Sequence, residues 1–167
     1  MAELTPQERL QPALLDRLTD DAPDERTEAR ERRVLSMHRL RSALLRDLAW
    51  LLNAGQLESV RDLGDYPEVR RSVLNYGIPD LAGLTLAGAD PAFIEKAIRD
   101  AILRFEPRIA PQSLRVTAMT EDKARSRSAL VFRIEGEIWA KPAAQPLYLK
   151  TEVDLETGDA VLTEGQA

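Results

Sequence analysis

The sequence predicts an α+β fold, in which N-terminal helices precede a small antiparallel β-sheet. Two stretches, residues 36–55 and 91–105, repeat apolar residues at the spacing of amphipathic helices. After residue 113 the apolar period changes to two, in consecutive runs that polar turns separate. Such one-sided alternation is typical of an antiparallel meander with one buried face. We expect the helix of residues 91–105 to cover that face, because helices and sheet pack as layers in this class.

The composition narrows the classes of protein to which the chain can belong. Its 167 residues suit one domain, for which roughly 100–200 residues is typical. The net charge of −5 disfavours nucleic-acid binding, which needs a basic surface. The absence of cysteine excludes disulfides and thiolate metal sites. No signal peptide is visible and no apolar run approaches the roughly 20 residues of a membrane span, so we expect a cytoplasmic protein without membrane insertion.

Residues 1–35 are predicted to form a charged N-terminal extension ahead of a domain that comprises residues 36–167. The extension contains a short apolar island, "LLDRL" (14–18), which is long enough for a turn or two of helix. The "TDDAPDERTEARERR" that follows mixes both charges with few apolar residues, which predicts a linker or a solvated helix. The island is alternatively a docking peptide that this linker tethers.

The first helix of the domain is expected within "SMHRLRSALLRDLAWLLNAG" (36–55). Its C-terminus is marked by Asn53 and Gly55, which suit the end of a helix. Arg41, Arg46 and Asp47 lie off the apolar stripe. The stripe itself consists of Met37, Leu40, Leu44, Leu48 and Leu51.

A second, shorter helix is predicted to begin at Pro67, because proline suits the first helical turn. Gly77 should end it. Val69, Val73 and Leu74 are expected on its inner side.

The third helix has the clearest apolar face, and it stops at the stretch "RFEPRI" (104–109). Asp90 is a candidate N-cap and Pro91 suits the first helical position. Pro107 disfavours helical geometry at Glu106, so the helix should end there. The expected inner face consists of Phe93, Ile94, Ala97, Ile98, Ala101, Ile102 and Phe105.

The strands of the sheet follow this helix. Turns are expected at "EDKARSRS" (121–128), "KPAAQP" (141–146) and "ETGD" (156–159). The alternating runs between them are residues 114–119, 130–138, 147–155 and a possible last strand at "AVLT" (160–163). We expect the strand of residues 147–155 or the last strand to form a free edge of the sheet.

Few residues offer catalytic chemistry. His38 is the single histidine, so a zinc site would need three carboxylates, which is unusual, and we expect a plain surface or boundary residue. A glycosidase needs only two acids across a cleft, and Glu106 with Asp80 or Asp90 would be the candidates. These acids lack diagnostic spacing, and aromatic residues for stacking on sugars make up only 5% of the chain. We therefore predict no catalytic residues, no metal and no cofactor.

The step Glu106-Pro107-Arg108 allows two interpretations. The two charges are either a local ion pair that braces the turn, or a pair that the rigid proline presents outward to complementary charges on a partner. An exposed brace would contribute only about 0–1 kcal/mol. The residues alone leave both interpretations open.

Several stretches taken together resemble the baseplate wedge proteins of contractile injection machines, a family that includes the TssE subunits of type VI secretion systems. The stretches are "LLRDLAWLLNAG" (44–55), "YPEVRRSVLNYGIPDLAG" (66–83), "IEKAIRDAILRFEPRI" (94–109), "LVFRIEGEIWA" (130–140) and "VDLETG" (153–158). The order and spacing of "LLN", "NYG" and "FEPR" carry the resemblance, which covers about residues 40–160.

The resemblance implies a structural role without catalysis. In the family, the protein is part of a six-fold baseplate, contacts the wedge scaffold subunits (TssF-, TssG- and TssK-like) and offers a platform for the contractile sheath (TssB- and TssC-like). The family's Glu-Pro-Arg motif maps onto Glu106, Pro107 and Arg108, which makes these the expected partner-binding residues. This favours the presented pair, with both charges on the surface. Sheath contact by strand addition suits a free sheet edge.

Two alternatives remain open. Phage-tail relatives of the family were once described as lysozymes, so one alternative is a lysozyme-like peptidoglycan hydrolase. The other is a generic adaptor that binds a peptide by strand addition.

Overall fold

The computed structural model describes residues 14–19, 24, 37–85, 88–119, 128–139 and 144–165. Most of the extension predicted at residues 1–35, the turn at 121–127 and the first part of "KPAAQP" lie outside the described residues. The helical elements are α1 (Leu14–Leu18), α2 (Met37–Leu52), η3 (Leu57–Ser59), α3 (Pro67–Arg71), η4 (Val73–Asn75) and α4 (Pro91–Phe105). The strands are β1 (Arg115–Met119), β2 (Ala129–Ile138), β3 (Gln145–Asp154) and β4 (Ala160–Glu164).

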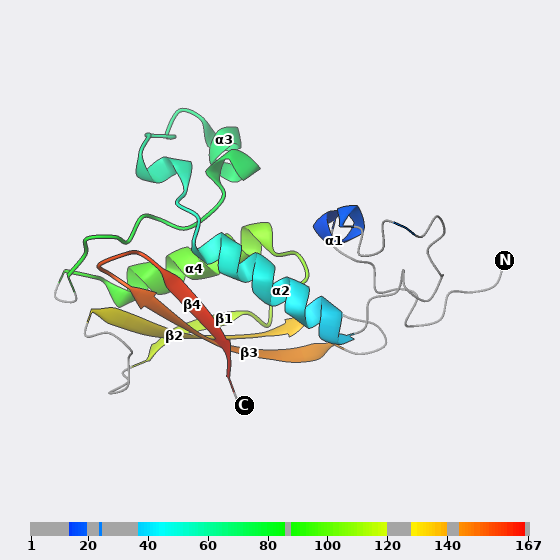
Figure 1. Cartoon of the computed structure of the whole chain (residues 1–167). Helices are drawn as coiled ribbons and strands as arrows, with labels where there is room; N and C mark the ends of the chain where they lie inside the picture. Colours follow the sequence, from blue (N-terminus) through cyan, green and yellow to red (C-terminus); the bar gives the residue numbers. More distant parts are fainter. Residues whose placement is uncertain are drawn as a thin grey trace.

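The fold is α+β, as predicted. All described strand pairs are antiparallel, and the sheet order β1-β2-β3-β4 is that of a simple meander. Both α2 and α4 pack over the sheet, while the segment with η3, α3 and η4 projects away from it (Figure 1). The prediction that α4 covers the sheet is confirmed, and α2 shares that role through its contacts with β4.

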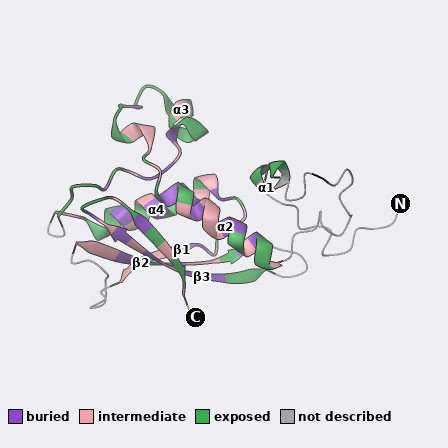
Figure 2. Ribbon diagram, viewed as in Figure 1, coloured by how far each residue is buried: buried purple, intermediate pink, exposed green. Residues whose placement is uncertain are grey.

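The core lies between this helical layer and the sheet, where Figure 2 shows buried residues on the facing sides of the elements. The helices contribute mainly leucines from α2 and isoleucines from α4. The side chains that are at most 1% exposed include Leu44, Leu48 and Leu52 of α2, Ile94, Ile98 and Ile102 of α4, Phe132, Ile134 and Ile138 of β2, and Leu147, Leu149 and Val153 of β3. Phe93, which was expected in the inner face of α4, is instead half exposed.

The ends of α4 follow the local chemistry of the sequence. The Asp90 carboxylate accepts a hydrogen bond from Ala92 N (3.0 Å), and Pro91 occupies the first turn. At the other end, Glu106 N donates to Ile102 O (2.9 Å) and the helix stops before Pro107. Both predicted boundaries of this helix are confirmed.

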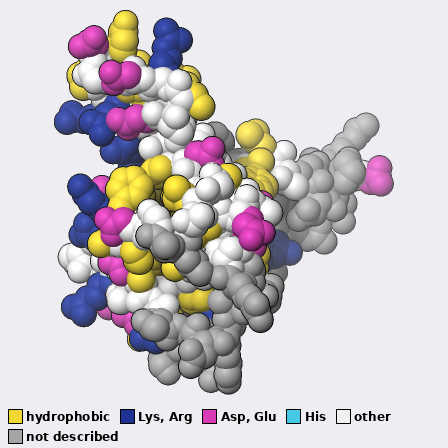
Figure 3. Space-filling view, turned by 90° about the vertical axis from the view of Figure 1, so that its left-hand side faces the viewer, with side chains coloured by type: hydrophobic (Ala, Val, Ile, Leu, Met, Phe, Trp, Pro, Cys, Tyr) yellow, Lys and Arg dark blue, Asp and Glu magenta, His cyan; other side chains and the backbone are white. Residues whose placement is uncertain are grey.

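The second predicted helix is shorter than expected, and the prediction that Val73 and Leu74 lie on its inner side is wrong. After α3, the extended backbone of Ser72 interrupts the helix and changes the phase of the side chains that follow. Val73 and Leu74 are therefore exposed, whereas the buried Asn75 donates to Arg70 O (3.1 Å) and accepts from Glu58 N (2.9 Å). Hydrophobic and charged side chains share the surface of this projection (Figure 3).

The projection returns to the domain through Gly77, whose φ of +117° suits only glycine. A Cβ here would lie 2.0 Å from Ala54 O. This close approach allows Ile78 and the end of α2 to pair, since Ile78 N donates to Ala54 O and Gln56 N to Ile78 O (both 2.9 Å).

The edges of the sheet are β1 and β4. The expectation of a free edge at the last strand is confirmed, but the alternative at residues 147–155 is wrong. β3 pairs with β2 along its whole length and with β4 over residues 149–153, because the terminal strand folds back through the turn at Gly158. None of the described helices is long and apolar enough to cross a membrane.

We predict that Ile98→Asp prevents cooperative folding. Ile98 is 0% exposed at the centre of the core, and a buried unpaired carboxylate costs more than about 4 kcal/mol, a large part of a typical stability of roughly 5–15 kcal/mol. Thermal melting followed by circular dichroism measures the effect. Arg99→Asp, at the exposed next position of α4, is the control and should melt like the wild type. A cooperative transition in Ile98→Asp would show that this face of α4 does not form the core.

Candidate functional site

The Glu106-Pro107-Arg108 step forms the exit of α4, and its three side chains differ in exposure. Glu106 caps the helix and is only 4% exposed. The side chain of Arg108 is 21% exposed, while Pro107 is exposed. The structure therefore places the acid of the step in the interior and only the proline fully at the surface.

Arg108 binds Glu106 through a two-pronged contact. Its Nε donates to Glu106 Oε1 (2.7 Å) and its Nη2 to Glu106 Oε2 (2.5 Å). The backbone N of Arg108 also donates to Glu106 Oε1 (3.0 Å). A bidentate arginine–carboxylate pair of this kind is stronger and more directional than a single ion pair. The turn at Pro107 is thus closed by three hydrogen bonds within the step.

A second carboxylate extends this pair to α2. Arg108 Nη2 also donates to Asp47 Oδ2 at 2.6 Å. Burial by itself would lower the pKa of Arg108, but its hydrogen bonds to Glu106 and then Asp47 raise that pKa above its ordinary value. Arg108 therefore stays charged and links the exit of α4 to the side of α2.

The backbone of the step is fastened to the sheet as well. Arg108 O accepts a hydrogen bond from Trp139 N (2.7 Å), and Ala110 N donates to Glu137 O (2.9 Å). Ile109, which is 2% exposed, forms a bridge with Ile138 at the end of β2. The step is therefore held by α4, α2 and β2 together.

These contacts decide part of the question that the sequence left open. The geometry is that of an internal brace, and the expectation that both charges lie on the surface is wrong for Glu106. Glu106 is buried because it stands at the end of a core helix. A carboxylate can be buried there only when a counter-ion pairs with it.

The sequence pattern did not single out Arg46 and Asp47, which lie off the apolar stripe of α2. Arg46 Nε donates to Asp47 Oδ1 (2.9 Å) and its Nη1 to Asp16 Oδ1 of α1 (2.7 Å). Acids and bases alternate along this acid–base chain, which we define as Asp16, Arg46, Asp47, Arg108 and Glu106. The only signal in the sequence was the adjacent pair of opposite charges at positions 46 and 47.

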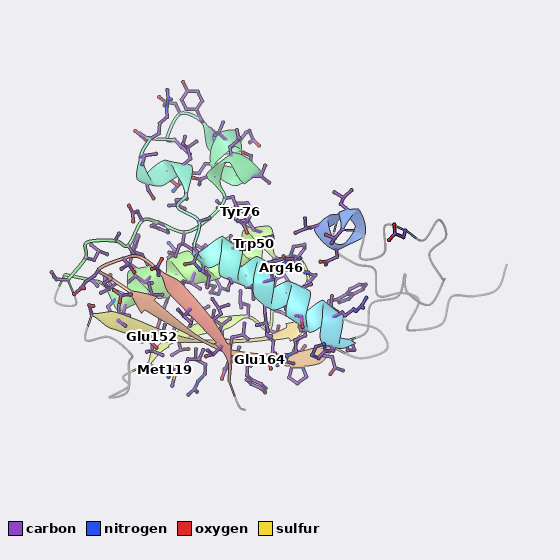
Figure 4. The ribbon with its side chains drawn as sticks, viewed as in Figure 1. Arg46, Trp50, Tyr76, Met119, Glu152 and Glu164 are labelled. Carbon is purple, nitrogen blue, oxygen red and sulfur yellow. The ribbon has the colours of Figure 1, made fainter. Side chains whose placement is uncertain are left out.

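Aromatic side chains surround the acid–base chain. The Arg46 guanidinium lies 5.2 Å from the ring centre of Trp50, one turn further along α2, and Figure 4 shows the two together. Tyr76 donates to Asp47 O (3.5 Å) and meets the ring of Phe105 edge-on at 5.1 Å. Trp139, which follows β2, is 61% exposed. Exposed aromatic surface therefore lies beside Arg46, at Trp50, and next to the step, at Trp139.

Three buried polar atoms of the acid–base chain lack a hydrogen-bond partner among the described residues. They are the donors Arg108 Nη1 and Arg46 Nη2 and the acceptor Asp16 Oδ2, although Arg46 Nη2 still forms an ion pair with Asp47 Oδ1 (2.8 Å). An unused buried donor or acceptor is unfavourable, so Arg108 and Asp16 retain capacity for a further group.

The other acids considered as catalytic partners have local roles. Asp80 Oδ1 accepts from Ala82 N (3.0 Å), and Asp90 caps α4. Glu106 is occupied by Arg108. His38 is an exposed residue of α2, as expected of a surface position. Within the described part of the chain, no group of three or more histidine or acidic side chains is arranged to hold a metal ion.

Comparison with protein families gives a match to the model of "Baseplate wedge protein gp25" over residues 38–143. This range contains all of α2 except Met37, together with α4, β1, β2 and the whole Glu106-Pro107-Arg108 step. Comparison with curated proteins and with solved structures gave no match. The match covers well over half of the chain and agrees with the resemblance carried by the sequence stretches. The chain therefore belongs to the baseplate wedge protein gp25 family, the structural components of phage tail-like baseplates that assemble with other baseplate and tail proteins.

Proposed function

We propose that this protein is the wedge subunit of a type VI secretion baseplate in the cytoplasm, without enzymatic activity. It docks on the wedge scaffold subunits through the surface around Glu106, Pro107 and Arg108. It also offers the free edge of its sheet as a platform on which the contractile sheath assembles. The family match and the rigid, partly exposed step together support this proposal.

The support for the docking surface is its rigidity. Contacts to α4, α2 and β2 hold the exposed Pro107 in place, so binding there loses little conformational entropy. The unused Nη1 of Arg108 suits an acceptor on a partner that reaches the step. Exposed Trp139 adjoins the step, and tryptophan and arginine are enriched at the energetic centres of interfaces.

The support for the sheath platform is that β4 has an open edge. Gly165 N donates to Tyr148 O, and Asp154 N donates to Asp159 O. The backbone N–H and C=O groups of the odd-numbered residues of β4 therefore point toward β3. The backbone groups of Leu162 and Glu164 therefore face away from the sheet. At Ala160 the outward groups are taken by Asn53, which bonds both its N and its O (2.9 and 2.8 Å).

The opposite edge is less open. The backbone N of Ala118, in β1, donates to the Glu95 side chain of α4. This N–H faces away from β2 and is already bonded to Glu95, so a strand added to β1 could not accept a hydrogen bond from it. We therefore assign strand addition to β4, and Glu164 marks the end of that edge in Figure 4.

The first test separates docking from folding at Pro107. Pro107→Gln should keep the melting temperature of the wild type but weaken binding to co-expressed scaffold subunits about ten-fold, because it adds bulk and loosens an exposed, rigid contact. Co-purification and titration measure the binding. Pro91→Gln is the control, since Pro91 is exposed at the opposite end of α4. Equal binding by both variants would place the interface elsewhere.

The second test measures the brace itself. Arg108→Gln should lower the free energy of unfolding by about 3 kcal/mol, because it leaves Glu106 buried without a counter-charge. Glu106→Gln combined with Arg108→Gln should recover part of that loss. Arg99→Gln, on the exposed side of α4, should change stability by less than about 0.5 kcal/mol. If Arg108→Gln melts like Arg99→Gln, the pair does not brace the turn.

The third test blocks the β4 edge. Leu162→Pro removes an outward N–H that β3 does not use, so the sheet should survive while sheath assembly on the baseplate fails. Sedimentation of sheath polymers from mixtures with scaffold and sheath subunits gives the readout. Leu162→Val keeps the N–H and should assemble normally, and Val161→Pro, which removes an inward N–H, should destabilise the fold. Normal assembly with Leu162→Pro would exclude strand addition at β4.

A further inference from the structure

The outer end of the acid–base chain is occupied by a segment of the protein's own N-terminal extension. Asp16, in the middle of α1, binds Arg46 of α2 at 2.7 Å. Asp47 forms ion pairs with both Arg46 and Arg108, so it connects Arg46 to the docking step. The apolar island "LLDRL", for which the sequence left a docking role open as an alternative, therefore lies beside the surface through which the domain is proposed to bind its partner.

The contact between α1 and the domain is light. Leu15 and Leu18 remain 41% and 74% exposed, so neither of these side chains is buried against the domain. The side chains of Asp16 and Arg46 are 18% and 34% exposed, and ion pairs near a surface hold their partners weakly. One oxygen of the Asp16 carboxylate is buried without a hydrogen bond from any described residue. A permanent structural contact would be expected to use both carboxylate oxygens and to bury Leu15 and Leu18.

We propose that α1 is an exchangeable occupant of the Arg46 surface, and that an acidic segment of a baseplate partner displaces it when the protein docks. This inference rests on the docking proposed above. The partner segment carries a carboxylate flanked by leucine-like side chains, because that is the chemistry of α1 itself. In the free protein, α1 keeps Arg46 neutralised; in the assembly, the partner's carboxylate takes the place of Asp16.

The surface suits such an exchange. Arg46 keeps its bonds to Asp47 and its position over Trp50 when Asp16 leaves, so the cation stays oriented for a new carboxylate. Trp50 is 54% exposed and offers apolar contact for the leucines of the incoming segment. Because α1 and α2 belong to one chain, α1 stays at high local concentration near Arg46 after it is displaced, so the exchange is reversible.

The strength of the Asp16–Arg46 ion pair sets how much α1 weakens the binding of the partner. An ion pair of this exposure favours the bound position of α1 by a factor of about two to five. The partner must compete with α1, so its apparent affinity is lower by the same factor. The extension therefore tunes the strength of docking without contributing to the folded core.

Fluorescence of the full-length protein tests whether Asp16 holds α1 at this surface. Trp50 and Trp139 are the only tryptophans, so a Trp139→Phe background reports on Trp50 alone. Asp16→Lys should free Arg46 and change the quenching of Trp50 by acrylamide. Asp24→Lys makes the same charge change at an exposed position of the extension and should leave the quenching unchanged. Equal quenching in both variants would overturn the placement of α1.

Binding measurements test the exchange itself, in the Trp139-containing protein. Asp16→Lys should bind the scaffold subunits about two- to five-fold more tightly than Asp24→Lys, and Arg46→Gln should bind more weakly than either. Unchanged or weaker binding of Asp16→Lys would show that α1 does not compete. If the wild type fails to bind the scaffold, the proposed docking and the exchange both fail, whereas a quenching change would still establish the contact of α1 with α2.

Discussion

The buried carboxylate of Glu106 is the constraint on which the site depends. Among the described residues it is the only charged side chain that the fold buries fully. A carboxylate in that position needs a cation and hydrogen bonds, and Arg108 supplies both through its forked contact. Pro107, between the two, is fixed as a consequence.

The same constraint connects the layers of the fold. α4 cannot end elsewhere without exposing Ile102 or removing Glu106 from Arg108. Asp47 brings α2 to the same arginine, and Trp139 N brings the end of β2 to its carbonyl oxygen. The apolar core holds the two helices against the sheet. Arg108 joins the same three elements a second time, through polar contacts.

The protein offers its two proposed contact regions on different structural elements. The braced step lies at the C-terminal end of α4, whereas the open backbone groups belong to β4, which pairs only with β3 (Figure 1). The core between them is dense with fully buried leucine and isoleucine side chains, and such cores are stiff. A stiff connection between a scaffold contact and a sheath contact suits a structural component of a baseplate, the role that the family match supports.

The sequence by itself determined the fold class, the bounds of α4 and the apolar faces of α2, α4 and the strands, because these follow from periodicity, capping and proline chemistry over short distances. It also singled out Glu106, Pro107 and Arg108. Only the tertiary structure decided that Glu106 is buried, that Val73 and Leu74 are exposed, and that β3 is an inner strand. It alone brought Asp16, Arg46 and Asp47 to Arg108, since ion pairs between residues 30 and 61 positions apart depend on how helices pack and leave no periodic trace in the chain.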